Sequence, residues 1–138
     1  MRFWDSSALV PLCLEQPRSA HARRMVAQDP EMIVWWGSAI ECASAIARLY
    51  REEQLTAKEE RAARAFLNAL SASWFEIQPG NSVRDQALRV LRLHPLRAPD
   101  ALQLAAALES SGSTPSGVFI TYDERLRAAA EREGFTTP

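Results

Sequence analysis

Four carboxylates stand almost alone in apolar stretches of this 138-residue sequence. An ionised carboxylate in apolar surroundings is costly unless a cation or hydrogen bonds compensate its charge. Four such acids, if they converge, would repel one another and call for a divalent cation. A site of this kind points to metal-dependent chemistry on phosphates. The four acids are Asp5 in MRFWDSSALVPLCL, Glu41 in GSAIECASAIA, Asp100 in APDALQLAAAL and Asp123 in GVFITYD.

Short apolar runs alternate with longer helical patterns along the whole chain. The expected strands are 1–4, 32–36, 74–77 and 118–121, with a short edge strand at 135–137. The expected helices are 6–14, 18–28, 38–53, 56–71, 82–93, 124–133 and one between Pro99 and Gly112. This alternation predicts an α/β fold: a three-layer sandwich around a central, mostly parallel sheet of four to five strands, in a single domain over residues 1–138.

The four acids fall at positions that such a sheet would bring together. Ligands of parallel α/β sheets bind beyond the carboxyl ends of the strands. Asp5 ends the first expected strand and Asp123 closes the fourth. Glu41 and Asp100 lie in the first turns of helices. All four positions are therefore compatible with one edge of one sheet.

Three of the acids also have a purely structural interpretation. Asp5 could cap the helix that follows it, and Asp100 could complement a helix dipole. Asp123 could cap the last helix, although Thr121 and Glu124 form a competing capping box. Glu41, the fourth acid, has no charged partner at the next turn of its helix. Capping alone does not explain why each acid is so isolated in its segment.

The overall charge gives no net basic field that would indicate nucleic-acid binding. Sixteen basic and 17 acidic residues leave a net charge of −1. RNA binding is still compatible with this value, because steering depends on the local field. Arg18, Arg23 and Arg24 form a local basic patch that could contact phosphates, although a solvated helix face accounts better for any one of them.

The cysteines and the apolar runs indicate a cytoplasmic protein. Cys13 and Cys42 form no CxxC pattern, and both lie among apolar residues, as expected of reduced core thiols. The longest uninterrupted apolar run, residues 8–14, is too short to cross a bilayer.

The remaining aromatic and imidazole side chains give weaker signals. His21 and His94 are expected at the surface and not as general bases. Trp35 and Trp36 could offer a stacking surface for unpaired bases, although strand tryptophans also serve as core. The sequence contains no GxxxxGK[ST] loop, no GxGxxG turn and no GxSxG elbow.

The four acidic segments together resemble a known family. MRFWDSSALVPL is similar to the opening of a PIN domain, and SAIECASAIARL to the central glutamate motif of that family. LRAPDALQLAAAL resembles its third acidic motif, and FITYDERLRAAAEREGF its last. The motifs occur in family order across essentially the whole chain. The chain length resembles that of the VapC toxins of bacterial type II toxin–antitoxin pairs.

The resemblance implies a ribonuclease that uses Mg²⁺, with Mn²⁺ as a possible substitute. It implies that Asp5 and Asp100 contact the metal and that Glu41 and Asp123 complete the site. It also implies an RNA substrate, a cognate antitoxin and a homodimer, with no membrane association. Thr121 is expected to orient the acids by hydrogen bonds, as is Ser6.

A non-enzymatic alternative remains open at this point. A binding module with the same fold could keep the four acids to hold a metal structurally or to dock a basic peptide from a partner.

Overall fold

Four short parallel strands form the centre of the molecule. The computed structural model describes residues 1–138. The strands are β1 (Arg2–Trp4), β2 (Met32–Trp35), β3 (Phe75–Ile77) and β4 (Phe119–Ile120), in the spatial order β3-β2-β1-β4. In the register, Phe3 lies opposite Ile33 on one side and Phe119 on the other.

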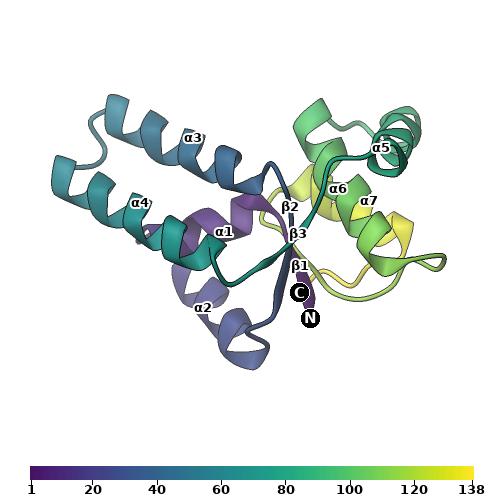
Figure 1. The fold of residues 1–138 in the computed structure, drawn as a ribbon, viewed down its shortest axis with the longest axis horizontal. Coiled ribbons are helices and arrows are strands. Elements are labelled where there is room, and N and C mark those ends of the chain that lie inside the picture. Colours follow the sequence, from purple (N-terminus) through teal and green to yellow (C-terminus); the bar gives the residue numbers. More distant parts are fainter.

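Seven helices cover the sheet in two groups, which confirms the predicted three-layer α/β fold. Figure 1 shows α1–α4 on one side of the strands and α5–α7 on the other. The helices are α1 (Ser6–Cys13), α2 (Ser19–Gln28), α3 (Ser38–Arg51), α4 (Ala57–Ser71), α5 (Asn81–Leu93), α6 (Ala98–Ser111) and α7 (Glu124–Glu133).

Alternation along the strands supplies a separate core to each helical layer. Phe3 packs with the α5–α7 layer and Trp4, fully buried, with the α1–α4 layer. Burial of apolar area on both faces is the main stabilising force of such a sheet. Helix α6 is alanine-rich and buried from Gln103 to Leu108, because small side chains let it approach both the sheet and its neighbouring helices.

Local signals in the sequence set several helix ends. Thr56 and Glu59 form the predicted capping box at the start of α4. Gly134 ends α7 with φ of 107°, a left-handed conformation that glycine adopts without strain. One prediction was too generous: residues 135–137 form no strand, and Thr136 makes only a single bridge to Val118. The chain contains no helix that is both long and apolar enough to cross a membrane.

Candidate active site

Two of the predicted acids follow neighbouring strands directly. Asp5 comes after β1 and caps α1, and its backbone N–H donates to Ile120 O of β4 at 3.0 Å. Asp123 comes three residues after β4 and caps α7. Because β1 and β4 are parallel neighbours, their carboxyl ends meet at one edge of the sheet. The predicted placement of these two acids at one edge is therefore found.

Asp5 is buried, with 2% of its surface exposed, and is held by three donors. Its Oδ2 accepts hydrogen bonds from Ser7 N at 3.1 Å, from Thr121 Oγ1 at 3.0 Å and from Ser7 Oγ. Burial raises the pKa of Asp5; the hydrogen bonds from Ser7 and Thr121 oppose this shift, and the charge of Asp100 adds to it. The carboxyl group is thus fixed in orientation while its charge is only partly compensated.

Glu41 lies in the first turn of α3 and reaches toward Asp5. Its Oε2 accepts from Ser6 Oγ at 2.7 Å and from Gln103 Nε2 at 3.2 Å. Ser6 Oγ also lies 3.4 Å from Asp5 Oδ1 and so connects the two acids. Burial raises the pKa of Glu41; the two hydrogen bonds oppose the shift, and the charges of Asp5 and Asp100 reinforce it.

Asp100 at the start of α6 and Asp123 at the start of α7 line one cavity of about 680 Å³. Asp123 Oδ1 accepts from Leu126 N at 2.8 Å, the capping bond of α7. Burial raises the pKa of Asp100, as does the charge of Asp123, against the lowering effect of Arg97 and Arg125. Both arginines also line the cavity.

The structure therefore brings the four acids into one electrostatic group. The charge of Asp100 acts on Asp5 and on Glu41, and that of Asp123 acts on Asp100. Three of the four carboxyl groups have raised pKa values, so the group as a whole favours an added positive charge, either a proton or a cation.

The donor set fits a hard divalent cation in chemistry but is not assembled into a coordination shell. Carboxylate oxygens are the ligands that Mg²⁺ and Mn²⁺ prefer. No three acidic, imidazole or thiol side chains are spaced to hold a metal ion together. Glu41 and Asp123 each have one oxygen engaged by the protein donors described above, whereas Asp5 has both engaged, Oδ2 by Ser7 and Thr121 and Oδ1 by Ser6 Oγ at 3.4 Å. Glu41 Oε1, Asp123 Oδ2 and the carboxylate of Asp100 receive no side-chain hydrogen bond and are the atoms most available to a ligand.

The sequence matches the PIN domain family over residues 2–132. The chain belongs to the PIN domain family. This family assignment agrees with the parallel sheet and its flanking helices.

Solved structures with the same fold span nearly the full length of this PIN domain. PAE2754 from Pyrobaculum aerophilum is 23% identical with a TM-score of 0.69, and the match covers 97% of this chain and 82% of that one. VapC20 from Mycobacterium tuberculosis, a sarcin-ricin loop cleaving toxin, is 20% identical with a TM-score of 0.69 over 94% and 95% of the two chains. A toxin–antitoxin complex from Klebsiella pneumoniae is 16% identical with a TM-score of 0.66 over 99% and 97%. No curated protein sequence matches the chain significantly.

Several side chains that support the acids of the PIN domain were not predicted. Ser6 and Thr121 bind the acids as expected, but Ser7 and Gln103 were missed. Gln103 is fully buried and is bound by Ser38, with 3.0 Å from Gln103 Nε2 to Ser38 Oγ. A glutamine inside an alanine-rich, apolar helix could have predicted this contact, because a buried polar side chain requires a hydrogen-bond partner.

One interpretation from the sequence was wrong, and one open alternative is decided by the structure. His94 is buried, not at the surface, and its Nε2 lies 2.7 Å from Glu133 Oε1. The capping box of Thr121 and Glu124 does not form; Thr121 Oγ1 instead accepts from Asp123 N at 3.1 Å.

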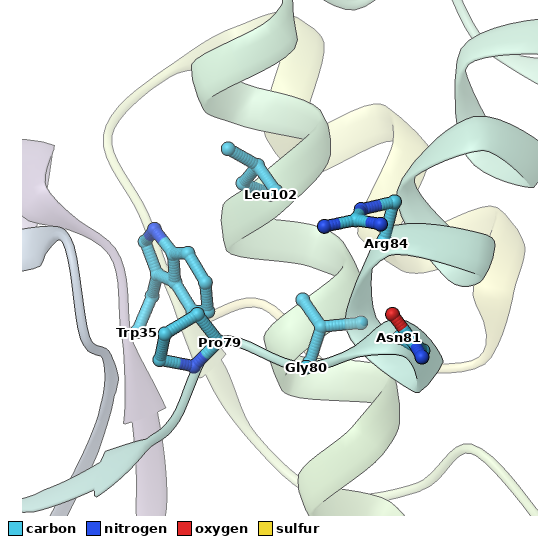
Figure 2. Close-up of a pocket in the computed structure, with 7 residues that line it drawn as sticks. Trp35, Pro79, Gly80, Asn81, Arg84 and Leu102 are labelled. Carbon is cyan, nitrogen blue, oxygen red and sulfur yellow. The ribbon is translucent and has the colours of Figure 1, made fainter.

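A second cavity of the PIN domain, of about 410 Å³, contains none of the four acids. Figure 2 shows Trp35 and Pro79 on one side of it, Leu102 on α6 and Arg84 on α5. Trp35 is buried in this wall, whereas Trp36 is 45% exposed. Of the two tryptophans proposed for base stacking, only Trp36 is thus largely open to solvent.

Proposed function

We propose that this PIN domain is a metal-dependent endoribonuclease and the toxin of a type II toxin–antitoxin pair, hydrolysing RNA phosphodiester bonds. The observation that carries the proposal is the group of four acids at the carboxyl edge of the sheet. Burial and mutual repulsion raise the pKa values of three of them, which favours a bound cation. Membership of the PIN domain family supports the same conclusion.

Asp5 and Asp100 are the proposed metal ligands, and Glu41 and Asp123 complete the site. The metal is Mg²⁺, with Mn²⁺ as the substitute. A divalent cation bound here supplies Lewis acidity, because it neutralises charge on the scissile phosphate and makes water more acidic.

The other side chains of the site hold the acids in place. Ser7 and Thr121 fix one oxygen of Asp5, so the second oxygen keeps a constant direction. Gln103 does the same for Glu41. Such outer contacts limit the rotation of the ligating groups and so lower the cost of assembling the site.

Two arginines extend the site toward a phosphate. Arg97 and Arg125 line the cavity that contains Asp100 and Asp123. Guanidinium groups bind phosphate oxygens in a bidentate manner. We expect them to hold the non-bridging oxygens of the RNA strand, whose negative charge the acids alone would repel.

A cell that produces an active cytoplasmic ribonuclease must inhibit its activity. The proposed inhibitor is an antitoxin. Two structures of the same fold, VapC20 and the Klebsiella pneumoniae complex, are described as a toxin and as a toxin–antitoxin complex. An arginine from a partner segment could replace the charge of the cation among the carboxylates. A homodimer is part of the same proposal.

RNA cleavage by the purified protein tests this function. We expect cleavage of single-stranded RNA with Mg²⁺, none in excess chelator, and a large loss in Asp5→Asn. A matched control is Asp85→Asn, because Asp85 lies on α5 outside both the acid site and its cavity. Robust cleavage by Asp5→Asn in chelator would refute the proposed mechanism. Binding of Mg²⁺ without any cleavage of RNA would favour the binding-module alternative.

A further inference from the structure

Three arginines without acidic partners surround the side chain of Tyr122. Arg18 lies over its ring, with 5.3 Å from the guanidinium carbon to the ring centre. The charges of Arg24 on α2 and Arg127 on α7 also act on Tyr122. None of the three forms a salt bridge, whereas Arg23, the residue before Arg24 on α2, is paired with Glu15.

The charges that act on the side chains between these arginines are all positive. His21 Nδ1 lies 2.8 Å from the Tyr122 hydroxyl. Burial lowers the pKa of His21, and the charges of Arg24, Arg18 and Arg127 lower it further. The three guanidinium groups therefore repel one another, and no salt bridge offsets this repulsion.

Arg127 carries a more specific sign of a missing partner. Its Nε is buried and has no hydrogen-bond acceptor in the protein. A buried donor without an acceptor is destabilising. An oxygen-rich anion bound among the guanidinium groups would relieve the repulsion among the three arginines.

The arginine group borders the acid site directly. The backbone N–H of Tyr122 donates to Ser7 Oγ at 2.9 Å, and Ser7 in turn binds Asp5. Tyr122 also lines the cavity of Asp100 and Asp123. An RNA strand can thus place one backbone phosphate at the acids and another at the arginines.

We propose that Arg18, Arg24 and Arg127 bind a backbone phosphate of the RNA strand next to the phosphate at the acid site. This inference rests on the proposed ribonuclease function and names the part of the substrate that the group recognises. Arginine forks suit phosphate oxygens, and backbone contacts position a strand without reading its sequence. The three arginines therefore fix the position of the RNA strand along the site and do not select a particular base.

The test measures binding in the absence of cleavage. Fluorescence anisotropy of a labelled single-stranded RNA, in EDTA and over a range of salt concentrations, gives the affinity and its salt dependence. The variants are Arg18→Gln, Arg24→Gln and Arg127→Gln. Arg23→Gln is the matched control, since Arg23 precedes Arg24 on α2 and its charge is already paired with Glu15. Because Arg18 and Arg24 are exposed, their replacement does not threaten folding.

Each variant of the three is expected to weaken binding and to reduce the slope of log K against log salt by about 0.7, the value for one phosphate contact on a single strand. Arg23→Gln should keep the wild-type slope. Equal slopes for wild type, Arg18→Gln and Arg24→Gln would overturn the proposal, as would a wild type that binds no RNA at low salt. Such a result would assign the arginines to an acidic protein partner.

Cleavage in Mg²⁺, measured in parallel, separates this inference from the function on which it rests. Normal binding by the arginine variants, together with RNA cleavage by wild type, overturns the phosphate site and leaves the nuclease intact. Weakened binding by the variants, together with no cleavage by wild type, supports the phosphate site and refutes the nuclease.

Discussion

Replacing Asp123 by asparagine and by alanine separates two roles of one side chain. Asp123 Oδ1 caps α7 through its 2.8 Å bond from Leu126 N. Its negative charge also acts on Asp100 across the cavity. Asparagine keeps an acceptor for the cap but loses the charge, whereas alanine loses both. A purely structural Asp123 would tolerate asparagine, and a ligand of the proposed metal would not.

The stability difference between the two variants follows from the cap alone. Loss of an N-cap acceptor costs about 1 kcal/mol. For a chain of 138 residues this corresponds to a fall in Tm of about 4 °C. Loss of charge at the helix N-terminus costs about 0.3–1 kcal/mol, and relief of the repulsion with Asp100 opposes it. Both of these effects are shared by the two variants, so they cancel in the comparison.

Thermal denaturation in chelator and RNA cleavage in Mg²⁺ provide the two measurements. Asp123→Ala should melt about 4 °C below Asp123→Asn. Both variants should lose most of the cleavage activity, because both remove the charge. Full activity in Asp123→Asn combined with reduced stability in Asp123→Ala would show that Asp123 is a helix cap and not part of the site.

Three other predictions concern the remaining acids. Because the pKa values of Asp5, Glu41 and Asp100 are raised, the folded state binds protons more readily than the unfolded state. In chelator, the free energy of unfolding should therefore rise as the pH falls from 8 toward 4.5. Urea denaturation across this range measures it, and a fall in stability over the same range would contradict the clustered acids. In chelator, Asp100→Asn should be as stable as wild type or more stable, because Asp100 receives no hydrogen bond from another side chain. Mg²⁺ should raise the Tm of this variant less than the Tm of wild type. A variant clearly less stable than wild type in chelator would show that Asp100 has a structural role. Wild-type protein expressed alone should arrest bacterial growth and Glu41→Gln should not, as colony counts would show; normal growth with abundant folded wild-type protein would count strongly against the toxin assignment.

The fold and the location of the site were predictable because they depend on rules that ignore packing detail. Alternating strands and helices give a parallel sheet, and ligands of such sheets bind at the carboxyl edge. Asp5 and Asp123 could be placed there from strand ends alone. The capping box of Thr56 was equally visible, because its donor and acceptor are three residues apart.

The contacts that orient the acids were not predictable because they join distant parts of the chain. Gln103 and Glu41 are 62 residues apart in sequence, and His94 and Glu133 are 39 apart. Only the tertiary fold brings each pair together, because Gln103 on α6 reaches the start of α3 and the end of α5 lies near the end of α7. At the start of α7, two local capping patterns competed and could not be ranked from the residue types alone. The structure shows that Asp123 is the cap, because its Oδ1 accepts from Leu126 N.

Direct measurement of Mn²⁺ binding tests the central claim that the four acids form a cation site. Titration calorimetry of wild type should show saturable binding with release of protons near the raised pKa values, because the metal displaces them. Asp100→Asn and Asp5→Asn should each bind at least about tenfold more weakly, the effect of about 1.4 kcal/mol. Unchanged affinity in both variants, or RNA cleavage by a wild type that binds no Mn²⁺, would contradict the claim.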